Sequence, residues 1–229
     1  MKLVPEQTVM ADPLHILRDL DRVPRGVIHV GANVGQEFPA YRAAGLAWGI
    51  YIEALPSVYE RLRLTLENAP NHLPINALCA DVDGEERIFH VASNDGNSSS
   101  MLEFGWHVAE HPEVEFIRTE HMTSRRLDTV IDEVCGTHPQ IDPHLLDCLV
   151  LDVQGSELRV LQGAHRCLSR ASYVYTEVNE GGLYKNDCSL DDVIAFMRLY
   201  RFRLKNLVIN RHNWGDALFI AQPSARARI

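Results

Sequence analysis

The stretch VIHVGANVGQ, residues 27–36, decides the fold of this chain. An apolar run rich in β-branched residues ends at Gly31, and a second glycine follows at Gly35. The pattern predicts a strand over residues 26–30 that enters a tight turn and continues into a helix over residues 36–44. Both glycines permit positive φ angles and let the backbone approach a ligand closely, so the turn is a candidate cofactor-binding loop.

The turn lacks the third glycine of a dinucleotide-binding fingerprint. Gln36 stands three positions after Asn33, and Glu37 follows at the start of the predicted helix. A negative charge there disfavours a pyrophosphate, which would bind at the same helix end. The carboxylate tolerates a ligand that carries an ammonium and a sulfonium. The loop therefore favours S-adenosylmethionine over NAD.

Bulk composition excludes several other classes of protein. The chain has 229 residues, of which 46% are hydrophobic and 23% charged, as in an ordinary soluble globular protein. The formal net charge of −9 disfavours a surface that neutralises phosphates, so we expect no nucleic-acid partner. No apolar run reaches membrane-spanning length, and the N-terminus lacks the apolar core of a signal peptide. We therefore expect no membrane partner and a cytoplasmic protein with reduced cysteines.

Hydrophobic periodicity alternates between strands and helices along most of the chain. The predicted strands are residues 26–30, 48–54, 74–80, 85–93, 146–155, 172–179, 202–209 and 216–222. The predicted helices are residues 36–44, 56–69, 126–134, 156–168 and 189–200. Only a short segment joins the last two strands, which requires an antiparallel pair. The pattern predicts an α/β fold, with a doubly wound, mostly parallel seven-stranded sheet, helices on both faces and a terminal antiparallel hairpin.

The pattern also predicts how the chain is divided. Residues 26–222 form one domain, preceded by a short helical extension over residues 1–25 and followed by a frayed tail over residues 223–229. Residues 94–126 interrupt the alternation with turn-forming residues and no clear period. We expect a lid or substrate loop there.

Candidate site residues follow five of the predicted strands. Because ligands bind beyond the carboxyl ends of the strands in an open parallel sheet, these residues should line one edge. In chain order they are Gly31, Asn33, Gly35, Glu53, Asp81, Asp152, Gln154, Glu177 and Asn179. Glu53 has the usual separation from Gly31 for a carboxylate that accepts hydrogen bonds from both ribose hydroxyls. Asp81 is placed to meet an adenine amino group, so the set predicts an adenosine pocket.

The chain resembles the FkbM-type S-adenosylmethionine-dependent methyltransferases. The segments VIHVGANVGQE, SNDGNSSSML, LVLDVQGSELRVLQGA and WGDALFI carry the resemblance, which extends over nearly the whole chain. It implies a Rossmann-like class I methyltransferase fold and methyl transfer, usually to a hydroxyl oxygen on a sugar or a natural-product scaffold. His29 departs from the family, in which many members carry Asp. Two interpretations of His29 stay open, a cofactor contact and a buried core histidine.

Catalytic candidates lie at the ends of two neighbouring strands. Methyl transfer from a sulfonium is an in-line displacement, and a hydroxyl acceptor must also lose a proton. We expect Asp152 to contact the cofactor and face the reacting centre, with Glu177 as a second catalytic candidate and Asn179 as a substrate contact. The alternative is that Asp152 and Glu177 only hydrogen-bond loop amides. Their oxygens also suit Mg²⁺, but the residues alone select no metal.

The loop region and the chain's last third add further candidates. His107 and His111 stand four positions apart and would share a helix face, His107 as a candidate general base and His111 as a substrate contact. Ser99 meets the cofactor or the substrate, or belongs to a plain polar turn. Tyr184 and Trp214 should flank the substrate mouth, although Trp214 would equally cap the hairpin.

Three functions compete. The leading one is an S-adenosylmethionine-dependent O-methyltransferase whose partner is a small-molecule or glycan acceptor. A nicotinamide-dependent oxidoreductase is disfavoured by the glycine count and by the absence of a Tyr-x-x-x-Lys motif. The third is a catalytically inactive cofactor-binding module. The sequence leaves the oligomeric state open, a homo-oligomer included.

Overall fold

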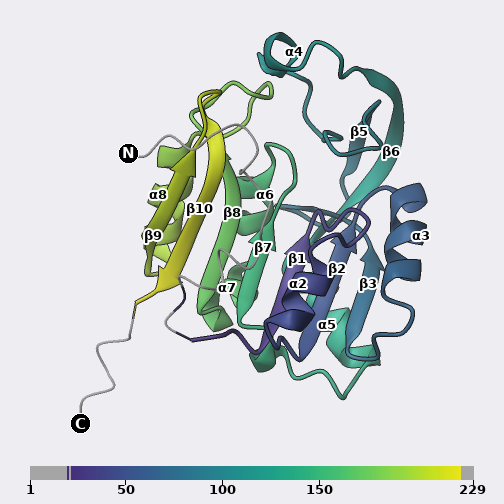
Figure 1. The fold of residues 1–229 in the computed structure, drawn as a ribbon, viewed down its shortest axis with the longest axis vertical. Coiled ribbons are helices and arrows are strands. Elements are labelled where there is room, and N and C mark those ends of the chain that lie inside the picture. Colours follow the sequence, from purple (N-terminus) through teal and green to yellow (C-terminus); the bar gives the residue numbers. More distant parts are fainter. Residues whose placement is uncertain (1–19, 21, 223–229) are drawn as a thin grey trace.

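A computed structural model describes residue 20 and residues 22–222. Its main sheet contains β1 (Gly26–Val30), β2 (Trp48–Glu53), β3 (His72–Asn76), β7 (Cys148–Leu151), β8 (Tyr173–Asn179), β9 (Phe202–Ile209) and β10 (Trp214–Ala221). The order is β3-β2-β1-β7-β8-β10-β9 (Figure 1). The pairings of β10 with β8 and β9 are antiparallel, and the other pairings in this sheet are parallel. The predicted seven-stranded fold is confirmed.

The central strands are apolar because the sheet is covered on both faces. Every residue of β1 and of β7 is buried, and such strands carry continuous apolar runs rather than an alternating pattern. The chain turns in opposite directions from β1 and β7, which are neighbours in the sheet. Their carboxyl ends therefore flank the crevice at which open α/β sheets bind ligands.

Helices cover both faces, as predicted. They are α2 (Phe38–Ala43), α3 (Pro56–Thr65), α5 (Leu127–Thr137), α6 (Glu157–Gln162), α7 (His165–Arg170) and α8 (Leu190–Leu199), with a short 3-10 turn at Pro143–Leu145. Residues of α5 to α8 join one apolar core, and residues of α2 and α3 join the core on the opposite face. The N-terminus of α8 carries a capping box, in which Ser189 and Asp192 each accept the other's backbone N–H.

A second, three-stranded sheet corrects two predictions. It contains β4 (Leu78–Ala80), β6 (Phe116–Arg126) and β5 (Glu86–Ala92), in the order β4-β6-β5. The predicted strand over residues 74–80 is two strands, because the chain leaves the main sheet after β3 and pairs with β6. Residues 94–126 are not all loop, since they contain β6 and the single-turn helix α4 (His107–Glu110).

A close backbone contact divides the helix predicted over residues 156–168. The chain forms α6 and α7 instead, with Gly163 and Ala164 between them. A β-carbon at Gly163 would lie 2.1 Å from the carbonyl oxygen of Ala80, so only glycine lets β4 pass this closely. The periodicity of the segment carries no sign of this contact.

Some predictions fall outside what the structure describes. Most of the predicted N-terminal extension lies in residues 1–19 and 21, and the predicted tail occupies residues 223–229; neither segment is described. The proposed division of the chain stays a prediction. In the described part of the chain, no helix is long and apolar enough to cross a membrane.

Candidate active site

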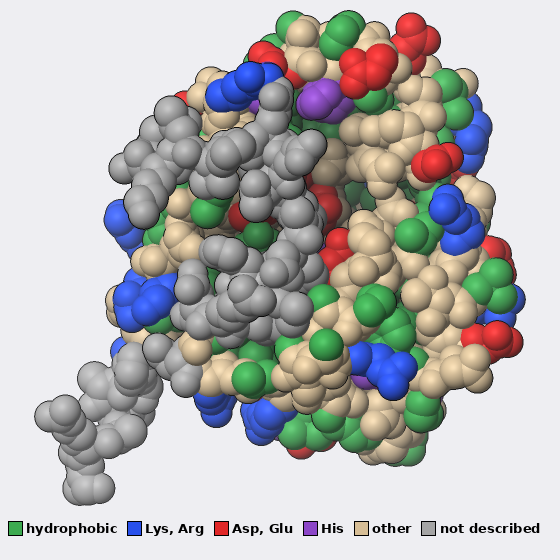
Figure 2. Space-filling view, in the orientation of Figure 1, with side chains coloured by type: hydrophobic (Ala, Val, Ile, Leu, Met, Phe, Trp, Pro, Cys, Tyr) green, Lys and Arg blue, Asp and Glu red, His purple; other side chains and the backbone are tan. Residues whose placement is uncertain are grey.

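A cavity of about 620 Å³ lies at the carboxyl ends of β1, β2, β7 and β8. Figure 2 shows a hollow on this face of the molecule with acidic side chains inside it and a histidine at its rim. The predicted site residues that line the cavity are Gly31, Asn33, Glu53, Ser99, His107, His111, Asp152, Gln154, Glu177 and Trp214. Residues from seven segments of the chain therefore meet in one cavity.

The turn after β1 brings β1 and β7 into close contact. Gly31 has a φ of 81°, and a β-carbon there would lie 1.7 Å from the carbonyl oxygen of Asp152. The glycine is needed for this approach of two strands, not only for an approach to a ligand. Asn33 follows in a left-handed conformation and donates from its side-chain amide to Oδ1 of Asn97, 2.9 Å away. The turn and the loop after β5 are thereby joined.

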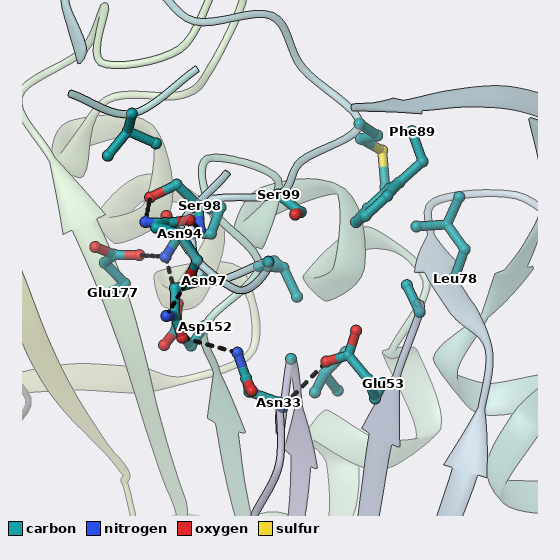
Figure 3. Close-up of a pocket in the computed structure, with 18 of the residues that line it drawn as sticks. Asn33, Glu53, Leu78, Phe89, Asn94, Asn97, Ser98, Ser99, Asp152 and Glu177 are labelled. Carbon is teal, nitrogen blue, oxygen red and sulfur yellow. Dashed lines mark hydrogen bonds between the residues drawn. The ribbon is translucent and has the colours of Figure 1, made fainter. Parts of the chain in front are cut away.

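Glu53 lies at the centre of the cavity wall. Its Oε2 accepts the backbone N–H of Asn33 at 3.0 Å, and its Oε1 accepts that of Leu55 at 2.8 Å. Burial raises the pKa of this carboxyl to about 7. Each oxygen has a further lone pair, so the carboxylate can accept hydrogen bonds from a ligand as well. In Figure 3, Glu53 lies between the apolar side chains of Leu78 and Phe89 and the polar group around Asp152.

Gln154 holds two acids together at the polar end. Its Nε2 donates to Oδ1 of Asp152 at 2.7 Å and to Oε2 of Glu177 at 2.9 Å, and its Oε1 accepts the hydroxyl of Tyr184 at 2.7 Å. Both polar ends of the Gln154 side chain are thus occupied by protein partners, whereas Asp152 and Glu177 each use one carboxylate oxygen in these bonds. The side chain of Gln154, a predicted cofactor-site residue, positions the two acids.

The polar end is strongly acidic. The carboxylates that line the cavity are Glu37, Glu53, Glu113, Asp152 and Glu177, and the described lining contains no lysine or arginine. Burial raises the pKa of Asp152, and burial together with the charges of Asp152 and Glu157 raises the pKa of Glu177 well above its usual range. A cationic ligand would be favoured here over an anionic one.

The helix α4 places two histidines at the cavity, on one face as predicted. His107 is buried, stacks on Phe104 with ring centroids 4.2 Å apart, and lies 5.1 Å from the ring of His111. Burial, and then the neighbouring His111, lower the pKa of His107 to about 4. Its Nδ1 has no hydrogen-bond partner in the described structure. His107 is therefore neutral at pH 7 and able to accept a proton or a hydrogen bond.

The polar turn after β5 forms one wall of the cavity. Asn94 accepts the backbone N–H of Ser98 and donates to its hydroxyl, while the hydroxyl of Ser99 accepts the backbone N–H of Ala92. The sequence predictions missed Asn94 and Asn97 as lining residues, together with Leu78, Phe89, Met101 and Glu113. The segment SNDGNSSSM was a usable signal for the two asparagines.

His29 belongs to the core beneath α2, not to the cavity wall. It is 2% exposed, and its ring packs edge-on against Tyr41 and tilted against Tyr51. Burial lowers its pKa to about 4. Of the two interpretations drawn from the sequence, the structure supports the buried core histidine.

Four further predicted residues do not line the cavity. Asp81 follows β4 in the second sheet and pairs with Arg87, so its predicted contact with adenine is wrong. Asn179 accepts the backbone N–H of Gly181. Tyr184 is 1% exposed and donates a hydrogen bond from its hydroxyl to Oε1 of Gln154, so it does not lie at the opening of the cavity as predicted.

Gly35 is the fourth of these residues. It has a φ of 79°, and a β-carbon there would lie 2.9 Å from the side chain of Leu62. It serves the packing of the turn on α3. Within the described residues, no group of three or more histidine, cysteine, aspartate or glutamate side chains is arranged to hold a metal ion.

The sequence of this chain is similar to those of known proteins. Residues 29–204 match the model of the methyltransferase FkbM domain. Over 115 residues, the chain is 27% identical to the 2-O-methyltransferase NoeI of Sinorhizobium fredii, a match that covers 48% of this chain and 44% of that protein. The chain thus matches less than half of this relative.

The chain also superposes on solved structures. A putative tRNA (m1A22) methyltransferase from Streptococcus pneumoniae superposes with a TM-score of 0.51 at 9% identity, covering 93% of this chain and 72% of that one. A precorrin-6y C5,15-methyltransferase from Geobacter metallireducens does so with a TM-score of 0.47 at 9% identity, covering 97% and 95%. At such identity, the likeness concerns the fold alone.

Proposed function

We propose, from the premise that this chain belongs to the methyltransferase FkbM family, that it transfers the methyl group of S-adenosylmethionine to a hydroxyl oxygen of a sugar, glycan or natural-product acceptor. One observation carries the proposal. A single cavity at the carboxyl ends of parallel strands has an apolar end and an acidic end, with Glu53 between them.

The apolar end and Glu53 suit an adenosine group. Leu78 and Phe89, on the same side of the cavity in Figure 3, offer apolar surface to a planar base. Glu53, already fixed by two backbone N–H groups, accepts hydrogen bonds from the two ribose hydroxyls. Ribose hydroxyls donating to a buried carboxylate make charge-assisted bonds, which are stronger than neutral ones.

The acidic end suits the remainder of the cofactor, which carries an ammonium and a sulfonium. Asp152 and Glu177 lie there, and the described lining offers no cation to neutralise them. When bound, the cofactor supplies an electrophilic methyl group beside these acids. A nicotinamide dinucleotide fits poorly, because its pyrophosphate would meet several carboxylates and no basic side chain.

His107, Asp152 and Glu177 are the catalytic residues of the proposal. His107 is neutral and its Nδ1 lacks a partner among the described residues, so this nitrogen accepts the hydrogen bond, and then the proton, of the acceptor hydroxyl. Gln154 keeps Asp152 and Glu177 in place beside the cationic portion of the cofactor, and the bound cation would favour their ionised forms. His111 and Trp214 line the same side of the cavity and contact the acceptor.

The relative NoeI supports oxygen as the methylated atom, since its name describes a 2-O-methyltransferase. The acceptor of our proposal is correspondingly a polyol with vicinal hydroxyls. We extend the proposal to a soluble, cytoplasmic enzyme that needs no membrane or nucleic-acid partner. The acidic cavity supports the absence of a nucleic-acid partner, because carboxylates repel phosphates.

Isothermal titration calorimetry with S-adenosylhomocysteine and NAD tests the cofactor. We expect binding of the first and not of the second, and Glu53→Gln should weaken binding at least about tenfold. Glu60→Gln, an exposed glutamate on α3, is the matched control and should not change affinity. Binding of NAD alone would refute the proposal.

Transfer of a radiolabelled methyl group to a panel of glycosides and their 2-deoxy analogues tests the reaction. Incorporation into a glycoside but not into the analogue that lacks the acceptor hydroxyl is the expected result. Tight binding of S-adenosylhomocysteine without transfer to any hydroxyl would favour an inactive cofactor-binding module instead.

A further inference from the structure

Four of the five carboxylates in the cavity wall have partners of their own. Glu53 accepts two backbone N–H groups, Asp152 and Glu177 share the amide of Gln154, and Glu113 lies 3.5 Å from Nδ1 of His111. The fifth is Glu37, the N-cap residue of α2, whose side chain makes no capping hydrogen bond; it interacts with Gln36 and with its own backbone but leaves Oε2 without a partner in the described structure.

Glu37 is buried in the cavity wall and has one carboxylate oxygen that accepts no hydrogen bond. The residue is 8% exposed, and the oxygen is Oε2, which has no hydrogen-bond partner within the described structure. A buried carboxylate oxygen without a donor is unfavourable unless a ligand supplies one. Burial, and then the charge of Asp152, raise the pKa of Glu37 to about 7. The two acids therefore influence each other across the same end of the cavity.

The chemistry of the missing donor follows from the lining. None of the neutral donors in the described lining bonds to this oxygen, and the lining contains no lysine or arginine that would supply a cationic donor. A ligand that brings a cation to the end of the cavity near Asp152 would supply both the donor and the opposite charge. In Figure 3, Glu53 lies between this end and the apolar side chains of Leu78 and Phe89, so a cofactor whose ribose binds Glu53 would extend its amino-acid portion towards Asp152.

We propose that Glu37 binds the ammonium group of the cofactor's amino-acid portion, and that this contact makes the site prefer S-adenosylmethionine and S-adenosylhomocysteine over adenosine ligands that lack the group. The inference rests on the proposed function. It assigns Glu37 as a cofactor-binding residue that acts separately from Glu53. Glu53 would contact every adenosine ligand, whereas Glu37 would contact only those that carry the ammonium.

Two ligands separate the contributions of the two glutamates. S-adenosylhomocysteine has the amino-acid portion, and 5′-methylthioadenosine has the same base, ribose and sulfur without it. Calorimetry with both ligands should be carried out on the wild-type protein, Glu37→Gln and Glu53→Gln. Glu113→Gln, which removes a cavity carboxylate that already has a partner, is the matched control for charge.

We expect Glu37→Gln to lose at least about tenfold in affinity for S-adenosylhomocysteine and less than about twofold for 5′-methylthioadenosine. Glu53→Gln should weaken both ligands, and Glu113→Gln should change neither by more than about twofold. Glu37→Asp keeps the charge with a shorter reach and should lose less affinity than Glu37→Gln. Glu37→Asp also provides the measurement of Glu37's contribution if Glu37→Gln does not fold.

The outcomes distinguish this inference from the proposed function. Unchanged affinity of Glu37→Gln for S-adenosylhomocysteine, in a wild-type background that binds it, refutes the assignment of Glu37 alone. An equal loss for both ligands also refutes it, because Glu37 would then shape the whole cavity. A wild-type protein that binds neither ligand refutes the proposed function and the inference together.

Discussion

Lowering the pH from 8 to 6.5 should stabilise the ligand-free protein. Glu37, Glu53 and Glu157 are buried, and burial raises the pKa of each from its usual 4.5 to about 7. A carboxyl with a raised pKa contributes stability that is present below its unfolded-state pKa and is lost as the pH rises through its folded-state pKa. The free energy of unfolding should therefore fall as the pH rises from about 4.5 to about 7 and should level off by about pH 8, where these groups are ionised in both states.

The size of the effect follows from the same pKa values. Between pH 8 and pH 6.5, a carboxyl shifted from 4.5 to about 7 contributes roughly 0.8 kcal/mol, so the three contribute about 2 kcal/mol together. Two buried histidines act in the opposite direction. His29 and His107 have a pKa of about 4, which costs about 0.4 kcal/mol each at pH 6.5, where the unfolded histidines start to bind protons. The net gain is about 1–2 kcal/mol.

Urea unfolding of the ligand-free protein at pH 8 and pH 6.5 measures this difference directly. Glu37→Gln should remove about a third of the carboxyl contribution, because glutamine does not titrate, whereas Glu60→Gln on the exposed face of α3 should leave the pH dependence unchanged. A stability that is flat or falls between pH 8 and pH 6.5 would refute the reasoning. So would an unchanged pH dependence in Glu37→Gln.

Three substitutions test other parts of the structure. Gly31→Ala should destabilise the protein by at least about 2 kcal/mol in urea unfolding, because its β-carbon would overlap the Asp152 carbonyl at a positive φ; a loss below 0.5 kcal/mol, as an approximate threshold, would contradict the close contact. Tyr184→Phe removes the hydrogen bond to Gln154 and should lower kcat about fivefold while the Kd for S-adenosylhomocysteine stays within about twofold; a selective loss of affinity would oppose this. Asp128→Ala removes the acceptor of two backbone N–H groups at the start of α7 and should cost about 2–3 kcal/mol in urea unfolding without a change in ligand affinity; a change in affinity would contradict a purely structural role.

The main sheet could be predicted because its strands are buried on both faces or end in clear turns. The apolar runs of β1 and β7 and the short connection before β10 left few alternatives. β6 could not be found in the same way. Its eleven residues, FIRTEHMTSRR, are mostly polar, so the sequence shows no alternation of apolar and polar residues even where exposure alternates in the structure.

The site could be predicted only as far as the edge of the sheet. The rule that ligands bind beyond parallel strand ends placed Glu53, Asp152 and Glu177 in one cavity. It failed for Asp81, because β4 had already left the main sheet for a pairing with β6. Strand ends are local features of the sequence, whereas strand pairing is a property of the whole chain.

The direction of a side chain is a second limit on such predictions. Gln154 and Tyr184 are near the predicted site, yet their polar atoms are committed to each other and to Asp152 and Glu177. Glu37 shows the converse. The sequence indicated that its charge disfavours a pyrophosphate and tolerates an ammonium and a sulfonium, but only the structure shows that its Oε2 has no hydrogen-bond partner among the described residues. Hydrogen bonds between segments far apart in sequence decide which polar atoms are free for a ligand.

Backbone strain and unfavourable charge occur together at this edge of the sheet. Asn33 and Gln154 have φ angles of 46° and 55°, although left-handed backbone costs a residue other than glycine about 1–2 kcal/mol. Glycine would relieve the strain at both positions, but it has no side-chain amide. The amide of Asn33 joins the turn to Asn97, and the amide of Gln154 holds Asp152 and Glu177. The strained backbone is thus retained because these two side chains arrange the carboxylates of the cavity before a ligand binds. A cationic ligand then meets carboxylates that need little reorganisation.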